Sequence, residues 1–188
     1  FSFGCLESES EVYAFYPFLM TMNDLGVLNQ LMRIKTSNGN TSNDAKYIED
    51  LYIKYMSTGE IHDVHKEELK SLLAHKKVLL IAPGKSSVEE KDVIQSFLEQ
   101  NDAIVISINS DYDYATTNFI FLSNLRRFKD LAPAKQNKCI VTSNIPADNI
   151  YLQVKYQDLL NDVVTVEDNA GLMAIKLMIN YNVAEIYL

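Results

Sequence analysis

The sequence has few of the features that define several large classes of protein. Its 188 residues include only two cysteines, Cys5 and Cys139, which are too few for a disulfide framework. Cys139 lies in the apolar run "KCIVTSN", where a buried free thiol is the common case. This cysteine usage predicts a reducing, cytoplasmic location. No apolar run approaches the roughly 20 residues of a membrane helix, and no basic-then-apolar signal segment opens the chain.

The chain also has fewer basic residues than acidic ones. Lys and Arg total 17 against 25 Asp and Glu, which gives a formal net charge of -8. A field of this sign repels nucleic acid phosphates and anionic lipids, so neither nucleic acid nor a membrane is an expected partner. The 47% of apolar residues is typical of a globular protein with a real core.

The composition changes along the chain and suggests two parts. Residues 11–34 are rich in Tyr, Phe, Leu and Met and predict helices interrupted at Pro17 and Gly26, and the polar run "KTSNGNTSND" after them predicts a loop. We therefore expect a helical extension and linker over residues 1–43 and a single domain over residues 44–188. Because the chain begins at Phe1 and ends at Leu188 within a predicted strand, we expect a longer parent protein.

The pattern over the second part predicts alternating helices and strands. Helical spacing in "DAKYIEDLYIKYM" and "HKEELKSLLAH" precedes the short apolar runs "VLLIA", "AIVISI", "NFIFL", "KCIVT", "VVTV" and "VAEIYL". Between these runs we predict helices in "SVEEKDVIQSFLEQN", "SNLRRFKDL", "NIYLQVKYQDLL" and "NAGLMAIKLMINYN", with the methionines of the last one in the core. Such alternation predicts an α/β fold, a Rossmann-like open parallel sheet with helices on both faces.

The turn "APGKSS" after the first strand contains the Gly-Lys-Ser end of a phosphate-binding loop. The first glycine of that motif would fall on Leu79, inside the strand, and no G-x-G-x-x-G is present. Two interpretations stay open. Pro83 and Gly84 make a plain turn before a helix capped by Ser86-x-x-Glu89 or Ser87-x-x-Glu90, or the turn holds an anion beside Lys85.

Polar residues follow the other predicted strands, and the carboxyl ends of strands are where open α/β sheets bind ligands. Two consecutive arginines, Arg126 and Arg127, stand out in an acidic chain because guanidinium groups suit phosphate or carboxylate. For any single residue of this kind, an ordinary polar loop is the better explanation. The candidate ligand-binding residues are Gly84, Lys85, Ser86, Ser87, Asn109, Asn124, Arg126 and Arg127.

No catalytic or metal-binding set can be assembled from the sequence. His62 and His65 have a spacing that some metal sites use, but no third ligand completes a set, so we predict solvated helix residues. No G-x-S-x-G elbow or Cys-His pair is suggested. The sequence names no cofactor.

The blocks "KKVLLIAPGKSSVEEKDVIQSFLEQNDAIVISIN", "FIFLSNLRRF" and "DNAGLMAIKLMINYNVAEIYL" resemble the C-terminal domain of a group of bacterial proteins. The N-terminal part of those proteins is similar to the HMG-CoA lyase and 4-hydroxy-2-oxovalerate aldolase barrel. The resemblance covers about residues 44–188 and implies an accessory Rossmann-like domain. The lyase chemistry would belong to a barrel in the same or a parent chain, so the resemblance supplies no catalytic residue.

A weaker similarity is to bacterial sialyltransferases and pterin-pyrophosphokinase-like proteins. Gly84, Ser86 and Asn109 occupy comparable places, but the order Pro-Gly-Lys-Ser differs from the Gly-Pro-Ser of those proteins. Three functions remain open at this point. The domain binds a phosphorylated or nucleotide-type ligand without catalysis, or it is a glycosyl- or nucleotidyl-transferase, or it is a purely structural assembly module.

Overall fold

The computed structural model describes residues 35, 46–48, 50, 63–160 and 169–188. The chain divides into two compact units, residues 1–60 and 61–188. In the first unit residues 46–48 and 50 are helical, inside the helix predicted over residues 44–56. The extension and linker predicted over residues 1–43 lie almost entirely outside the described residues.

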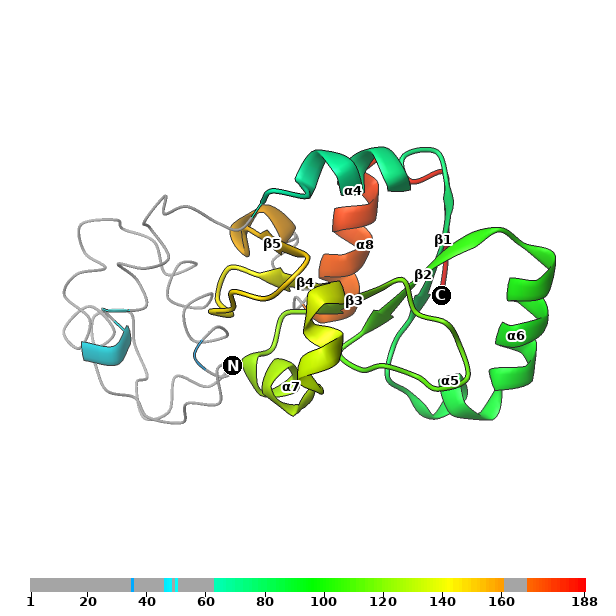
Figure 1. Ribbon diagram of the computed structural model, residues 1–188, viewed down its shortest axis with the longest axis horizontal. Coiled ribbons are helices and arrows are strands. Elements are labelled where there is room, and N and C mark those ends of the chain that lie inside the picture. Colours follow the sequence, from blue (N-terminus) through cyan, green and yellow to red (C-terminus); the bar gives the residue numbers. More distant parts are fainter. Residues whose placement is uncertain (1–34, 36–45, 49, 51–62, 161–168) are drawn as a thin grey trace, which may run out of the picture. The chain divides into compact units, whose positions relative to one another are not determined.

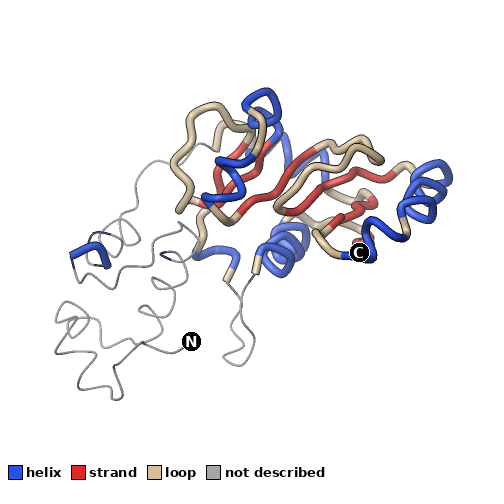
Figure 2. The backbone as a smooth tube through the Cα atoms, turned by 90° about the horizontal axis from the view of Figure 1, so that it is seen from below, coloured by secondary structure: helices blue, strands red, loops and turns tan. Residues whose placement is uncertain are grey.

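In the described part of the second unit, six strands form one parallel sheet, which Figure 2 shows as a continuous layer with helices on both sides. The strand order is β5-β4-β3-β2-β1-β6. This arrangement confirms the predicted α/β, Rossmann-like fold. The strands are β1 (Lys77–Ile81), β2 (Ala103–Ile108), β3 (Phe119–Leu122), β4 (Cys139–Thr142), β5 (Leu152–Val154) and β6 (Glu185–Tyr187).

The route of the chain explains which helices cover which face. From β1 to β5 the chain steps across the sheet in one direction, and it then returns to place β6 on the other side of β1. Because parallel crossovers are right-handed, the helices of the outward steps cover one face and the helix of the return step covers the other. The helices are α4 (Lys66–Leu73), α5 (Lys85–Glu89), α6 (Lys91–Gln100), α7 (Leu125–Asp130) and α8 (Ala170–Asn180), with 3-10 helices η2 (Pro133–Lys138) and η3 (Gln157–Leu159).

The strand register shows that α6 and α7 cover the same face. Ile81 of β1, Ser107 of β2 and Ile120 of β3 are successive partners across the sheet, so their side chains share this face. Ile81 packs in a cluster with residues of α6, and Ile120 packs in a cluster with Phe128 of α7. Helix α8 contacts β2 and β3 and completes the layer on the opposite face.

The end of α8 that leads to β6 lies next to α4, which precedes β1 (Figure 1). The N–H of His75, after α4, donates to the carbonyl of Asn182, after α8, at 2.9 Å. Burial, with Glu67 nearby, raises the pKa of Tyr181 to about 12. Two methionines of α8 are buried, which confirms the prediction that the methionines of this segment belong to the core.

Two helix predictions need correction. The segment over residues 149–160, predicted as a helix, contains strand β5 and the 3-10 helix η3. Leu152 and Val154 are buried on either side of the half-buried Gln153, and this period of two is the strand signal. The helix predicted over residues 87–101 is interrupted at Glu90, whose φ of -104° and ψ of 22° separate α5 from α6. The predicted strand "VVTV" lies outside the described residues.

The last strand is predicted correctly in place but not in extent. β6 pairs in parallel with β1, with Val78 opposite Ile186. Leu188, the last residue of the predicted strand, is 85% exposed. The physical reason is that the strand ends at Tyr187 and lies at the edge of the sheet, where only one neighbour covers it.

Candidate functional site

The carboxyl ends of the parallel strands gather the polar loops of the domain along one edge of the sheet. β1 is the strand at which the strand order reverses, since β2 lies on one side of it and β6 on the other. Open α/β sheets bind ligands at the carboxyl edge beside such a reversal. The loops after β1 and β2 are therefore the first places to look for a ligand site.

The turn after β1 is exposed and is not capped as predicted. α5 begins at Lys85 after the extended Gly84, which has no side chain to serve as a cap. Ser86 and Ser87 lie inside the first turn, so neither forms the predicted capping box. Ser87 instead donates its hydroxyl hydrogen to the Gly84 carbonyl at 2.7 Å, and Lys85 pairs with Glu89 at 3.2 Å on the surface.

The loop after β2 contains a group of polar atoms that lack partners. In the part of the chain that the structure describes, four buried side-chain oxygens make no hydrogen bond: Ser107 Oγ, Asn109 Oδ1, Tyr112 OH and Tyr114 OH. All four come from the end of β2 and the six residues after it. Ser107 is 0% exposed, so bulk water cannot reach its hydroxyl. Such atoms are rare in folded proteins, because nearly all buried polar groups are paired.

The two tyrosines bring their rings onto the face of the sheet that carries Ser107. Both rings pack against the apolar cluster that contains Ile81, and their centroids lie 5.3 Å apart. Burial raises the pKa of Tyr112, so this phenol keeps its proton at neutral pH. The Tyr112 hydroxyl lies near the side chains of Ser87 and Ser110 without reaching hydrogen-bonding geometry with either, and the Ser87 hydrogen is already donated to Gly84.

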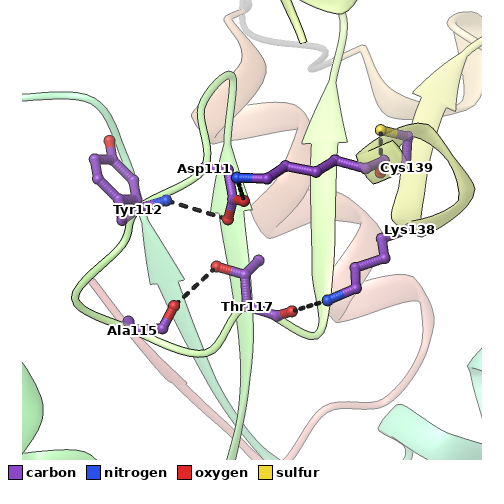
Figure 3. A network of polar contacts seen from close by, with 7 residues as sticks. Asp111, Tyr112, Ala115, Thr117, Lys138 and Cys139 are labelled. Carbon is purple, nitrogen blue, oxygen red and sulfur yellow. Dashed lines mark hydrogen bonds and ion pairs between the residues drawn. The ribbon is translucent and has the colours of Figure 1, made fainter. Parts of the chain in front are cut away.

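Three contacts hold this loop in place, two of which Figure 3 shows. Lys135 of η2 pairs with the Asp111 carboxylate at 2.5 Å, and Lys138 Nζ donates to the Thr117 carbonyl at 3.2 Å. From α6, the Gln95 amide donates to the Tyr114 carbonyl at 3.0 Å. These contacts, from η2 on one side and from α6 on the other, restrain the loop that carries the unpaired oxygens.

The ion pair fixes the charge state of the loop. Partial burial alone would raise the pKa of Asp111, but hydrogen bonds from Lys135, Thr117 and the Tyr112 backbone, with the charge of Lys135, outweigh it and hold that pKa below its ordinary value. Asp111 is therefore a carboxylate at neutral pH and a weak proton acceptor. The pairing also raises the pKa of Lys135.

After β3, the residues predicted to bind a ligand form the capped start of helix α7. Asn124 caps α7, because its Oδ1 accepts from the N–H groups of Arg126 and Arg127 at 3.0 and 3.2 Å. Both arginine side chains are exposed. Since α7 and α6 cover the same face, these cations lie on the same face of the sheet as the helices that follow Gly84. The structure gives no contact between either arginine and Lys85.

The polar residues after β4 differ from those after β2 because they are paired. Thr142 Oγ1 donates to Asn144 Oδ1 at 2.6 Å, and Asn144 Nδ2 donates to the Ser123 carbonyl at 3.2 Å. Unpaired polar atoms are therefore not a general property of this edge of the sheet. Among the described residues they mark the β2 end alone.

Sequence reasoning named Asn109 and missed Ser107, Tyr112 and Tyr114. Ser107 does leave a signal, since it is the one polar residue in the strand run "AIVISI", which is otherwise apolar. The tyrosines leave none, because only the fold of the loop carries their rings onto the sheet. Among the histidines, His65 stacks on Tyr151 at 4.7 Å and bonds Glu68 at 2.8 Å, while His62 lies outside the described residues.

Comparisons of this chain with protein-family models, with curated proteins and with solved structures give no match. Within the described residues no helix is long and apolar enough to cross a membrane. In the same residues, no group of three His, Cys, Asp or Glu side chains is arranged to hold a metal ion. Cys139 is a buried free thiol, as predicted, and burial raises its pKa to about 12.

Proposed function

We propose that residues 61–188 form an accessory domain that binds a phosphorylated or nucleotide-type ligand at the carboxyl edge of its sheet and does no chemistry alone. The observation that carries this proposal is the set of four unpaired oxygens at the end of β2. Leaving a buried polar group unpaired costs about 1–3 kcal/mol. This set distinguishes the end of β2 from the paired polar residues after β4, and it is the feature of the carboxyl edge that supports a ligand site there.

The phosphate end of the ligand is assigned to the turn Gly84–Ser87, next to β2. The Lys85–Glu89 pair is a surface contact, with the lysine side chain 87% exposed, so it holds the lysine weakly and leaves it able to turn to an anion. Arg126 and Arg127 supply two further exposed cations on the same face of the sheet. Guanidinium groups bind phosphate with two parallel hydrogen bonds.

The link to an aldolase-like protein rests on the sequence resemblance over residues 44–188. A transferase is the less favoured alternative, because such an enzyme would need a general base near Asn109 or Asp111. Asp111 is committed to Lys135 at 2.5 Å, and its lowered pKa makes it a poor proton acceptor. A binding domain requires no such base.

A thermal-shift screen tests the proposal with nucleotides, nucleotide sugars and sugar phosphates on the full chain. A ligand at 100 times its dissociation constant raises the free energy of unfolding by about 2.7 kcal/mol. For a chain of this size that corresponds to a melting shift of about 5–10 °C. Any hit is then repeated with Lys85→Ala and Arg126→Ala.

Lys70→Ala is the matched control, since Lys70 is an exposed lysine on α4, away from the carboxyl edge. We expect the shift to shrink in both site variants and to persist in the control. A hit that is indifferent to both site variants would place the phosphate elsewhere. Failure of every compound to shift the melting temperature would refute the binding proposal.

A further inference from the structure

Helix α7 is a short basic helix in an acidic protein. Three of its six residues are basic, namely Arg126, Arg127 and Lys129, against the single acidic residue Asp130. All three basic side chains are exposed. None of them takes part in an ion pair within the described residues. Because like charges three residues apart on a helix repel each other, Arg126 and Lys129 do not stabilise the free domain.

Helix α6 has the opposite charge. Its N-cap residue Glu90 and its residues Asp92 and Glu99 are acidic and exposed, and Lys91 is the one basic residue of the helix. The ion pairs of the described part of the chain include none of these acidic residues. Asp92 and Glu99 are two turns apart, so they lie on the same side of the helix. The composition of α6 is thus the reverse of that of α7.

The two helices lie on one face of the sheet, on either side of the boundary between β2 and β3. α6 connects β1 to β2, α7 follows β3 and precedes β4, and both pack on this face. A two-fold axis parallel to the strands, above that boundary, exchanges the two sides of the face. It therefore places α6 of one copy against α7 of a second copy, and the same contact forms twice.

Apolar side chains accompany the charges on both sides. Val88 of α5 and Val93 of α6 are 61% and 64% exposed, and they flank the acidic residues at the start of α6 in the sequence. After α7, the small residues Ala132, Pro133 and Ala134 are exposed. Protein interfaces combine an apolar centre with a polar rim, so each side supplies both components.

We propose that this face binds a second copy of the chain in a two-fold symmetric dimer, with α6 of each copy against α7 of the other. Opposite charges across the interface favour this pairing, because juxtaposed like charges would weaken any other arrangement of the same surfaces. A symmetric dimer requires a self-complementary surface, and the acidic α6 and basic α7 provide one. The proposal goes beyond the proposed function and does not depend on it.

Charge reversal in pairs tests the proposal on the full chain. Sedimentation velocity and native mass spectrometry measure association at up to millimolar concentration. In α6, Asp92 lies in the first turn and Glu99 in the last, so the effects of two introduced lysines on the helix dipole offset each other. The two variants are Arg127→Glu with Lys129→Glu, and Asp92→Lys with Glu99→Lys.

The matched control is Lys66→Glu with Lys70→Glu. Both lysines are exposed on α4, which lies next to α8, the helix of the opposite face (Figure 1). The control changes the net charge by the same amount as the reversal in α7. All variants keep Lys85 and Arg126, the residues that test ligand binding, so failure of assembly and failure of the proposed function are distinguishable.

We expect the unchanged chain and the control to dimerise. Each charge-reversed variant alone should associate at least about tenfold more weakly, because like charges then meet in both copies of the contact. One variant is acidic at both helices and the other is basic at both. An equal mixture of the two should therefore form a mixed dimer, which native mass spectrometry detects when one chain is isotopically labelled.

Three outcomes would overturn the proposal. The unchanged chain could stay monomeric at millimolar concentration. The dimer could persist in both variants, which would place the interface on another surface. Both variants could lose the dimer without recovery in the mixture, although circular dichroism shows them folded, which would mean that α6 and α7 face some other partner. For a variant that does not fold, the neutral changes Arg127→Gln with Lys129→Gln, or Asp92→Asn with Glu99→Gln, should weaken association about three- to fivefold, and no weakening refutes the contact.

Discussion

Removing the buried hydroxyl of Ser107 and removing that of Thr142 should change the free energy of unfolding in opposite directions. Ser107 of β2 and Thr142 of β4 are both 0% exposed. Thr142 donates to Asn144 Oδ1 at 2.6 Å, whereas Ser107 Oγ has no partner. The variants Thr142→Val and Ser107→Ala delete one hydroxyl each and leave the rest of the backbone and side-chain pattern intact.

The expected magnitudes follow from these contacts. Thr142→Val leaves the Asn144 oxygen unpaired in the interior, which should lower the free energy of unfolding by about 1–3 kcal/mol. Ser107→Ala breaks no hydrogen bond and removes a hydroxyl whose unpaired burial costs about 1–3 kcal/mol. The small void left by one oxygen offsets part of that gain, so we expect a change between zero and about 2 kcal/mol of stabilisation.

Urea unfolding followed by circular dichroism at the helix band measures both changes, because the chain has no tryptophan for fluorescence. The slope of the free energy against urea must stay constant for the comparison to hold. The melting temperatures should differ by at least about 2–4 °C, with the serine variant the higher. If Ser107→Ala is destabilised as much as Thr142→Val, then Ser107 has a partner in the free protein, and the argument for a ligand at β2 collapses.

Two further predictions concern charge and chemistry. Because the folded pKa of Asp111 lies below its ordinary value of 3.8, its pairing with Lys135 stabilises the fold above that value and is lost as the pH falls through the lower folded pKa. Asp111→Asn should therefore reduce the acid dependence of unfolding below about pH 4, and an unchanged acid profile would show that the pair contributes nothing. The chain alone should release pyruvate from 4-hydroxy-2-oxo acids only at background rate with added divalent metal, since the resemblance assigns that chemistry to a separate barrel. Reproducible turnover would contradict this assignment.

The sequence predicts the sheet well because its strands are continuous apolar runs. "AIVISI", "NFIFL" and "KCIVT" are too short for helices and are buried on both faces, so period and length agree. The sequence does not predict strand β5, because its three residues are too few to show a clear alternating pattern within the helical spacing around them. The break at Glu90 escapes for a related reason, since no proline or glycine marks it.

The site is harder to predict than the fold because it is marked by buried oxygens that lack hydrogen-bond partners. Sequence motifs drew attention to Lys85, Arg126 and Arg127, whose polar groups face solvent and need no ligand for their own stability. The oxygens of Tyr112 and Tyr114 become informative only when the fold buries them without partners. No pattern of residue types records whether a buried hydroxyl has found a partner.

The contacts that anchor the β2 loop explain why its unpaired oxygens persist in the free protein. A mobile loop would rotate its tyrosines outward and satisfy their hydroxyls with water, which would remove the cost of burial. Lys135 and Gln95 oppose that movement by restraining Asp111 and the Tyr114 backbone from two different elements. Lys135→Ala should therefore loosen the loop and let water reach the tyrosine hydroxyls, and it should weaken binding of a ligand at this edge of the sheet. The loss in affinity would arise because the ligand must then also restrain the loop.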